Sequence, residues 1–211
     1  MMTLLPALTF GFVLGVKHAT DADHIAAIGT LAQGSASPAR AARLGAMWGV
    51  GHSVSVLLVG GALVLLRLPM PARLALALEF VVAMMLIVLG VRSLRRRTAA
   101  GETSPLRPFL VGIVHGLAGS AVLALLLVST ATSAAAAAVY LVCFGIGTVA
   151  GMAVVTVLLT LPARLRPGRA VAFERALRTT AGVASIAIGV YLAHRIGVQD
   201  GLFAATPRWE P

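Results

Sequence analysis

The stretch His18-Ala-Thr-Asp21-Ala-Asp23-His24 lies within an apolar run that extends from about Leu4 to Leu31. The run is long enough to cross a bilayer, because about 20 mostly apolar residues in a helix span the hydrocarbon core. Each charged group inside such a span costs about 2.5–3.5 kcal/mol on insertion scales, so these carboxylates and the neighbouring Lys17 need a compensating partner. A divalent transition metal is one such partner. The sequence therefore predicts a membrane helix that carries a metal-binding cluster.

The rest of the chain has the composition of a membrane protein. It has 211 residues, of which 59% are hydrophobic and only 11% are charged, and its mean hydropathy is +0.96. In lipid, each backbone N–H and C=O must be satisfied within its own segment, so apolar spans are expected to be helices. We therefore predict an all-α membrane protein of about six transmembrane helices, the first near 4–31 and the others near 44–66, 72–91, 108–129, 135–161 and 179–198.

The basic residues indicate an orientation and do not indicate nucleic-acid binding. The net charge is +10, but aromatic residues make up only 5% of the chain and the arginines cluster between apolar runs. The loops after the first, third and fifth runs hold most of them, so these loops are predicted to be cytoplasmic and both termini to face outward. We expect a multi-pass protein of the cell inner (plasma) membrane, with the basic run Arg92–Arg97 in contact with anionic lipid.

The two halves of the sequence resemble each other. Gly15-Val-Lys-His18 matches Gly112-Ile-Val-His115, Trp48-Gly-Val-Gly51-His52 matches Phe144-Gly-Ile-Gly147-Thr148, and Ile87-Val-Leu-Gly90 matches Ile186-Ala-Ile-Gly189. Because each half has three spans, the second half enters the membrane from the opposite side, which is the plan of many secondary transporters. We expect a first repeat at 1–97, a cytoplasmic linker at 98–107 and a second repeat at 108–211.

Helix geometry limits which residues of the first cluster can bind one ion. At about 100° per residue, His18, Asp21 and His24 drift across one face, whereas Asp23 points nearly opposite Asp21. A straight helix cannot direct all four side chains at one ion. We therefore predict a break or wide turn between Lys17 and His24, or a supporting role for Asp23 such as orienting a histidine.

Other polar residues of the apolar spans extend the candidate site. His52 is expected to complete the ligand set or to relay protons. His115 is a stronger candidate for the site than an isolated histidine would be, because the repeat pairs it with His18. Ser53 and Thr148 are candidates for supporting roles or, with His115, for a site in the second half. Glu79 is interpreted as a snorkelling or paired carboxylate near the outer interface.

Imidazole together with carboxylate suits nickel, cobalt, zinc or iron, whereas magnesium and calcium prefer oxygen ligands alone. The single cysteine, Cys143, excludes an internal disulfide and a CxxC redox pair.

The motifs resemble those of the nickel/cobalt transporter family. His18-Ala-Thr-Asp21-Ala-Asp23-His24 resembles the HX4DH motif of that family, and Trp48-Gly-Val-Gly51-His52-Ser53 resembles its second conserved region. The resemblance implies transport of Ni2+ or Co2+, with His18, Asp21, Asp23 and His24 in metal recognition and His52 beside them. Members usually have eight spans with the motif in the second, so this chain is more similar to the shorter UreH-like and HupE-like relatives.

The leading hypothesis is a permease that takes up Ni2+ or Co2+ by alternating access, with the metal as transported substrate and no resident cofactor. An efflux carrier of the same fold is an alternative. A metal-dependent intramembrane enzyme is a weaker one, because the repeat suggests alternating access and no second cluster supplies an acid–base pair. We therefore expect a transporter and not an enzyme. The sequence is compatible with an oligomer and does not define the number of subunits.

Overall fold

The computed structural model describes residues 4–33, 37–66, 70–95, 104, 106–130, 133–165, 168 and 170–209, and those residues form helices and short connections with no β-strand among them. The α-helices are α1 (Leu4–His18), α2 (Ala22–Leu31), α3 (Pro38–Ser55), α4 (Gly61–Leu65), α5 (Ala72–Arg95), α6 (Leu106–Thr130), α7 (Ala134–Leu165) and α8 (Ala170–His194). Two π-helical turns, η1 (Val56–Gly60) and η3 (Arg195–Gln199), continue α3 and α8. The predicted all-α class is confirmed.

Four helical stretches of the described chain are long and apolar enough to cross a membrane: Pro38–Leu63, Ala72–Arg95, Ala134–Ala163 and Ala170–Gln199. Large apolar side chains also cover the outside of the molecule. Val154 and Leu158, one turn apart on α7, are 57% and 58% exposed, and Leu58 is 68% exposed. A large apolar surface of this kind marks contact with lipid or another protein, so the chain is a multi-pass membrane protein.

Several helices extend beyond the predicted apolar spans. Helix α3 begins at Pro38, where the Ser37 hydroxyl accepts a hydrogen bond from the Arg40 backbone N–H at 3.1 Å and caps the helix. Helix α8 begins at Ala170, nine residues before the predicted span, and its first turns carry charged side chains such as Glu174. Hydropathy locates the lipid-facing part of a helix, and a helix that projects beyond the lipid continues with polar residues.

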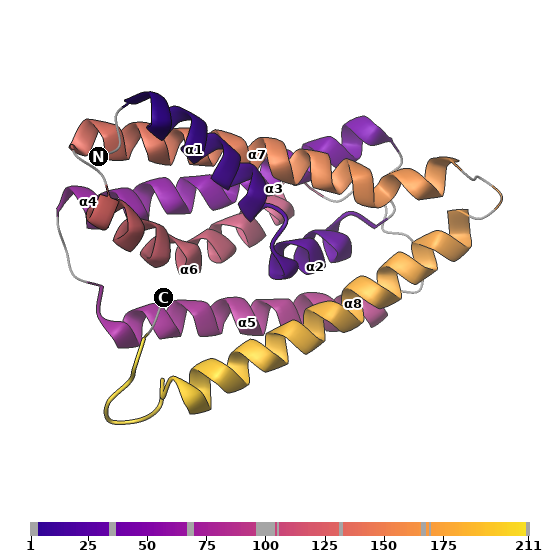
Figure 1. The fold of residues 1–211 in the computed structure, drawn as a ribbon. Helices are drawn as coiled ribbons and strands as arrows, with labels where there is room; N and C mark the ends of the chain where they lie inside the picture. The colour runs from indigo at the N-terminus through magenta and orange to yellow at the C-terminus, as the bar shows by residue number, and fades with distance from the viewer. Residues whose placement is uncertain are drawn as a thin grey trace.

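The first predicted span is two helices and not one. Helix α1 ends at His18, helix α2 begins at Ala22, and residues 19–21 form a turn between them. Figure 1 shows α2 turned away from the line of α1, toward α5 and α8. The predicted break between Lys17 and His24 is confirmed, because α1 stops within that interval.

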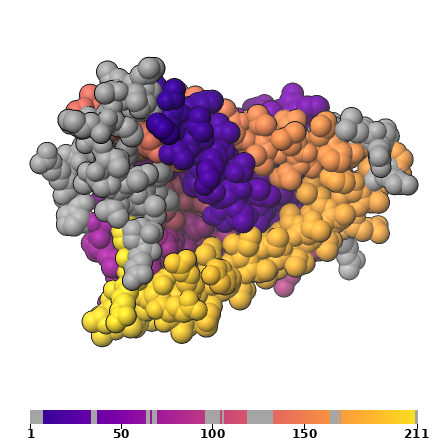
Figure 2. All heavy atoms as spheres, in the orientation of Figure 1, coloured from indigo at the N-terminus to yellow at the C-terminus, as the bar shows by residue number. Residues whose placement is uncertain are grey.

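The helices form two packed groups. Helix α7 lies against α1 and α3, and α3 lies against α6, while α5 and α8 lie side by side on the other side of the molecule (Figure 1). Helix α2 follows α1 in the chain and contacts α7 of the first group and α5 and α8 of the second, so it joins the two groups. In Figure 2, the indigo atoms of α1 and α2 lie between α7 in orange and α8 in yellow-orange. The broken helix therefore lies where the groups meet.

Glycines bring helix backbones into direct contact. A Cβ atom on Gly15 of α1 would overlap the α7 backbone at residues 144–148, and a Cβ on Gly112 of α6 would overlap the α3 backbone at residues 48–52. Glycine is required at both positions, because even a methyl group would force the helices apart.

The same kind of contact recurs elsewhere in matched pairs. Gly51 of α3 packs on the carbonyl of Phe109, and Gly147 of α7 packs on the carbonyl of Phe12. Gly90 of α5 packs on the α8 backbone near residues 182–186, and Gly189 of α8 packs on the α5 backbone near residues 83–87. Each contact thus has a counterpart in which both partners are replaced by the residues 96–99 positions away in the sequence, one further along the chain and the other further back.

Buried serines connect helices through hydrogen bonds to backbone carbonyls. Ser55 of α3 donates to the carbonyl of Ile113 on α6 at 2.8 Å, and Ser185 of α8 donates to the carbonyl of Leu86 on α5 at 2.7 Å. Such bonds contribute to helix association where no hydrophobic force operates between helices in lipid.

Two predictions fall partly outside the described residues. Arg92 and Arg95 are exposed at the end of α5, whereas Arg96 and Arg97 lie outside the described chain, so the predicted lipid contact of this run stays a prediction. Of the predicted linker 98–107, only Ser104 and residues 106–107 are described, and those last two belong to α6.

Candidate metal-binding site

The turn between α1 and α2 determines where the side chains of His18, Asp21, Asp23 and His24 point. The backbone N–H groups of Thr20 and Asp21 donate to the carbonyls of Lys17 and His18 at 2.9 and 3.1 Å, which tightens the end of α1. Asp21 then adopts an extended conformation, with φ −64° and ψ 148°, before α2 begins. The chain changes direction here, so side chains that would point apart on a straight helix can face one region.

Four histidines from four helices meet at that region. His18 ends α1, His24 lies in the first turn of α2, His52 lies near the end of α3, and His115 lies on α6. The ring centres of His18 and His24 are 4.3 Å apart, and those of His24 and His115 are 4.2 Å apart. His24, His52 and His115 are at most 3% exposed. The structure therefore brings His52 and His115 to the cluster predicted from the first span.

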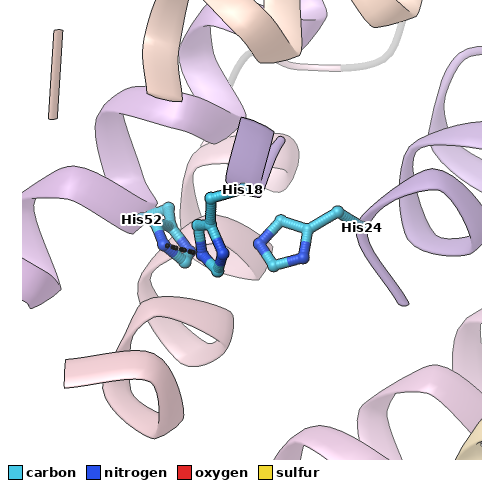
Figure 3. Close-up of side chains that lie close together, drawn as sticks. All are labelled: His18, His24 and His52. Carbon is cyan, nitrogen blue, oxygen red and sulfur yellow. Dashed lines mark hydrogen bonds between the residues drawn. The ribbon is translucent and has the colours of Figure 1, made fainter. Parts of the chain in front are cut away.

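Three of these imidazoles can converge on one ion. His18, His24 and His52 each offer a ring nitrogen, and the three nitrogens lie within 4.8 Å of one another. Figure 3 shows the His18 ring between those of His52 and His24, and the Nε2 atoms of His18 and His52 are 3.2 Å apart. Two nitrogen ligands about 2.1 Å from one metal ion are at most about 4.2 Å apart, so small ring movements suffice for coordination.

Both aspartates lie behind histidines. The His18 Nδ1 is 2.9 Å from Asp21 Oδ2, and the His24 Nδ1 is 3.0 Å from Asp23 Oδ1. An ionised carboxylate can only accept, so each Nδ1 carries the proton, and in the neutral imidazole each Nε2 has a lone pair that can accept a hydrogen bond or bind a metal. Carboxylates that orient metal-binding histidines in this way fix the tautomer and raise the basicity of the imidazole.

Asp23 also connects the two halves of the chain. Its Oδ2 lies 2.9 Å from Nε2 of His115, while its Oδ1 accepts from the His24 backbone N–H at 2.9 Å. Asp23, His24 and His115 form a second group whose potential ligand atoms lie within 4.8 Å of one another. His24 belongs to both groups, so an ion held by either group contacts the same ring.

Buried ring nitrogens in the cluster have no hydrogen-bond partner. They are Nε2 of His24, Nδ1 of His52 and Nδ1 of His115. An unsatisfied buried polar atom costs about 1–3 kcal/mol. A bound cation would satisfy the lone pair of His24 Nε2, which faces the region between the rings, so the donor set fits a transition metal.

A cavity of about 200 Å³ adjoins the cluster. Its walls include His18, His24, His52, His115 and Asp23, together with apolar side chains of α5, α6, α8 and η3. Glu79 of α5 lines the same cavity. A lone acidic residue within an apolar span was the available signal, but only the packing of α5 shows which way it points.

The two hydroxyl-bearing candidates donate to backbone carbonyls, Ser53 to one on another helix and Thr148 to one within its own helix. Ser53 Oγ donates to the carbonyl of Gly145 at 3.1 Å, and Thr148 Oγ1 donates to the carbonyl of Phe144 at 2.8 Å. Neither side chain lines the cavity.

Sequence reasoning missed Trp48 as a member of the site. Its buried ring lies 5.4 Å from that of His24 and 5.7 Å from that of His115, measured between centres. Trp48 precedes His52 by one helical turn, and this i, i+4 spacing on one face was a signal that could have found it.

A buried group of imidazoles and carboxylates inside a multi-pass helical protein is the arrangement expected of a membrane metal-ion transporter. The comparisons with known proteins agree with that class. Residues 4–97 match the family model described as a high-affinity nickel-transport protein. The chain is 33% identical over 219 residues to the urease accessory protein UreH of Bacillus sp. (strain TB-90), and the match covers 95% of this chain and 96% of that protein. No solved structure matches the chain.

The chain therefore belongs to the nickel/cobalt transporter family, in its shorter UreH-like branch. The resemblance found in the motifs is confirmed over nearly the full length. The family indicates a role in transport of nickel or a related metal ion and not in catalysis.

Proposed function

We propose that this chain is a permease of the cell inner membrane that takes up Ni2+ or Co2+ by alternating access, binding the ion through His18, His24 and His52. The observation that carries the proposal is the convergence of these three ring nitrogens within 4.8 Å, with a carboxylate behind two of the rings. Imidazole is a good ligand for both metals, and the transported ion is the substrate and not a resident cofactor.

Asp21 and Asp23 act in this proposal as supports that hold His18 and His24 in the metal-binding tautomer. Each negative charge also compensates part of the charge of the incoming dication, which lowers the free energy of the ion in an apolar surrounding. His115 holds Asp23 from the second half, so the site depends on contact between the halves.

Alternating access requires two parts that can move against each other, and we propose a 3+3 inverted repeat with six spans for this role. The glycine contacts support it. When each residue is exchanged for its counterpart 96–99 positions away, the contact of Gly15 becomes that of Gly112. In the same way, the contact of Gly51 becomes that of Gly147, and the contact of Gly90 becomes that of Gly189. The packing of α1 on α7 likewise becomes the packing of α6 on α3. Such a pattern follows from a pseudo-twofold axis between two similar halves.

The test is uptake of radioactive nickel and cobalt by cells that lack their own nickel system and express this chain. We expect faster accumulation of either metal than in cells with an empty vector, and greater sensitivity to added metal. Resistance to added metal with lower accumulation would show efflux instead. The absence of any change in either metal would contradict the proposal.

The proposed topology makes a separate prediction. With the arginine-rich ends of α3, α5 and α8 in the cytoplasm, alkaline phosphatase fused to the C-terminus is expected to be active, because that enzyme works only outside the cytoplasm. A fluorescent protein that folds only in the cytoplasm should be dark at the same position. The reverse pair of signals would invert the topology, and with it the direction in which Glu79 faces.

A further inference from the structure

Glu79 is a carboxylate that the histidine site does not use. It lies on α5 about two turns from the start of the helix, among apolar residues such as Ala77, Phe80 and Val82. The cavity that contacts His24 and His52 extends to it, so a small ion in that cavity can reach the imidazoles and this carboxylate without crossing a helix.

The partner of Glu79 comes from the end of the chain. The indole N–H of Trp209 donates to Glu79 Oε1 at 2.9 Å. Among the described residues, the hydrogen bond that the Glu79 carboxylate accepts is this one. The neighbouring Arg195 forms an ion pair with Asp200, at 3.6 Å. A neutral donor compensates a carboxylate in an apolar span only in part.

The segment that carries Trp209 is folded back over α5 and η3. Leu202 is buried against Leu76 and Ile196, and the Trp209 ring packs against the same group. Arg73, near the start of α5, donates to the carbonyl of Ala204 at 2.8 Å. Ile196 also lines the cavity, so residues 200–209 lie at the end of the cavity where Glu79 stands.

We propose that Glu79 is a second cation-binding group, which holds the divalent ion in transit between the histidine cluster and the membrane face on which residues 200–209 lie. This inference rests on the proposed transport function. The indole N–H of Trp209 donates to the Glu79 carboxylate when no ion is bound there, and this hydrogen bond breaks when the ion arrives. A single carboxylate binds a transition metal more weakly than three imidazoles, and conduction requires sites weak enough to release the ion.

The experiment separates binding from transport in the full chain. Nickel affinity is measured by calorimetry on detergent-solubilised protein, and the initial rate of nickel uptake is measured in proteoliposomes. For Glu79→Gln we expect an uptake rate lower by about tenfold or more and a nickel Kd within about twofold of wild type. The substitution removes the ligand of the transit site and leaves the three histidines of the main site in place. Glu174→Gln makes the same chemical change on α8 outside the cavity, and both quantities should stay at wild-type values.

Two further variants keep the inference falsifiable if the glutamine variant folds poorly. Glu79→Asp keeps the charge but withdraws it by one methylene, and it is expected to transport more slowly than wild type with unchanged affinity. Trp209→Phe removes the indole N–H and keeps an aromatic ring, and its uptake rate should equal or exceed that of wild type. A wild-type rate in folded Glu79→Gln or in Glu79→Asp, or a rate in Trp209→Phe as low as that of Glu79→Gln, would overturn the inference.

The outcomes also distinguish this inference from the transport proposal. If the wild-type chain moves no nickel, the proposed function fails. If wild type transports, His24→Ala does not, and Glu79→Gln equals wild type, only the transit site fails. Loss of nickel affinity in a folded Glu79→Gln would place the carboxylate in the main binding site and overturn its role in transit.

Discussion

Replacement of His24 by alanine is expected to raise the nickel Kd by at least about 100-fold, which corresponds to a loss of about 2.7 kcal/mol. His24 is the residue shared by both potential ligand groups, and its buried Nε2 has no other partner. Loss of the side chain therefore removes a ligand from either arrangement. Calorimetry with nickel on the purified protein gives the Kd, and uptake into cells should fall to the level of the empty vector.

The matched control for this variant is His194→Ala. His194 ends α8 and is exposed, and it lies outside both ligand groups, so nickel binding and uptake should remain at wild-type values. Nickel affinity that stays within threefold of wild type in His24→Ala would contradict the site, provided that both variants elute as folded protein.

Asp23→Asn provides a graded comparison at the same site. The amide is neutral and cannot accept from both His24 and His115 as the carboxylate does. The His24 tautomer that binds metal through Nε2 therefore loses its support. We expect a Kd raised by about 10–100-fold, the range found for partners of metal ligands. A loss larger than that of His24→Ala would show that Asp23 is itself the stronger ligand.

The second large effect is expected from Gly15→Ala. The new methyl group would overlap the α7 backbone near residues 144–148, so α1 must move away from α7. Overpacking of this kind costs about 1–3 kcal/mol. Because Gly15 lies one turn before His18, the movement also displaces a ligand. We expect a lower unfolding temperature in detergent together with weaker nickel binding.

Two other glycine variants make that result specific. At Gly61 an added Cβ meets nothing within 4 Å, so Gly61→Ala should be neutral or stabilising by up to about 1 kcal/mol. Gly112→Ala should destabilise as Gly15→Ala does, because Gly112 makes the matching contact of α6 on α3. If Gly15→Ala and Gly61→Ala had equal stabilities, the close approach of α1 and α7 would be refuted.

The break in the first helix could be predicted from the sequence because it depends only on residues that are close together in the chain. The angles between His18, Asp21 and Asp23 depend only on helical periodicity, and a straight helix could not serve all of them. The partner of each carboxylate could not be predicted in the same way. Which histidine meets Asp23 depends on the direction of α2 after the turn at Asp21 and on the position of α6, and these are properties of the packed molecule.

The contribution of α5 to the site was also beyond the sequence. Glu79 belongs to a helix that is apolar on most sides, so composition could not show which side faces the histidines. Its placement depends on how α5 packs against α6 and α8. The importance of His115, by contrast, could be predicted from the repeat, because its match to His18 is a property of the order of residues along the chain.

The interruption between α1 and α2 has an electrical consequence. The carbonyl end of α1, at His18, carries about half a negative elementary charge, and the amide end of α2, at Ala22, carries about half a positive one. Asp23, in the first turn of α2, is thus stabilised as an anion, while the end of α1 attracts a cation. A continuous helix would have cancelled both partial charges at this depth. The break therefore gives the middle of the molecule two opposite poles a few residues apart, one to hold the carboxylate and the other to receive the dication.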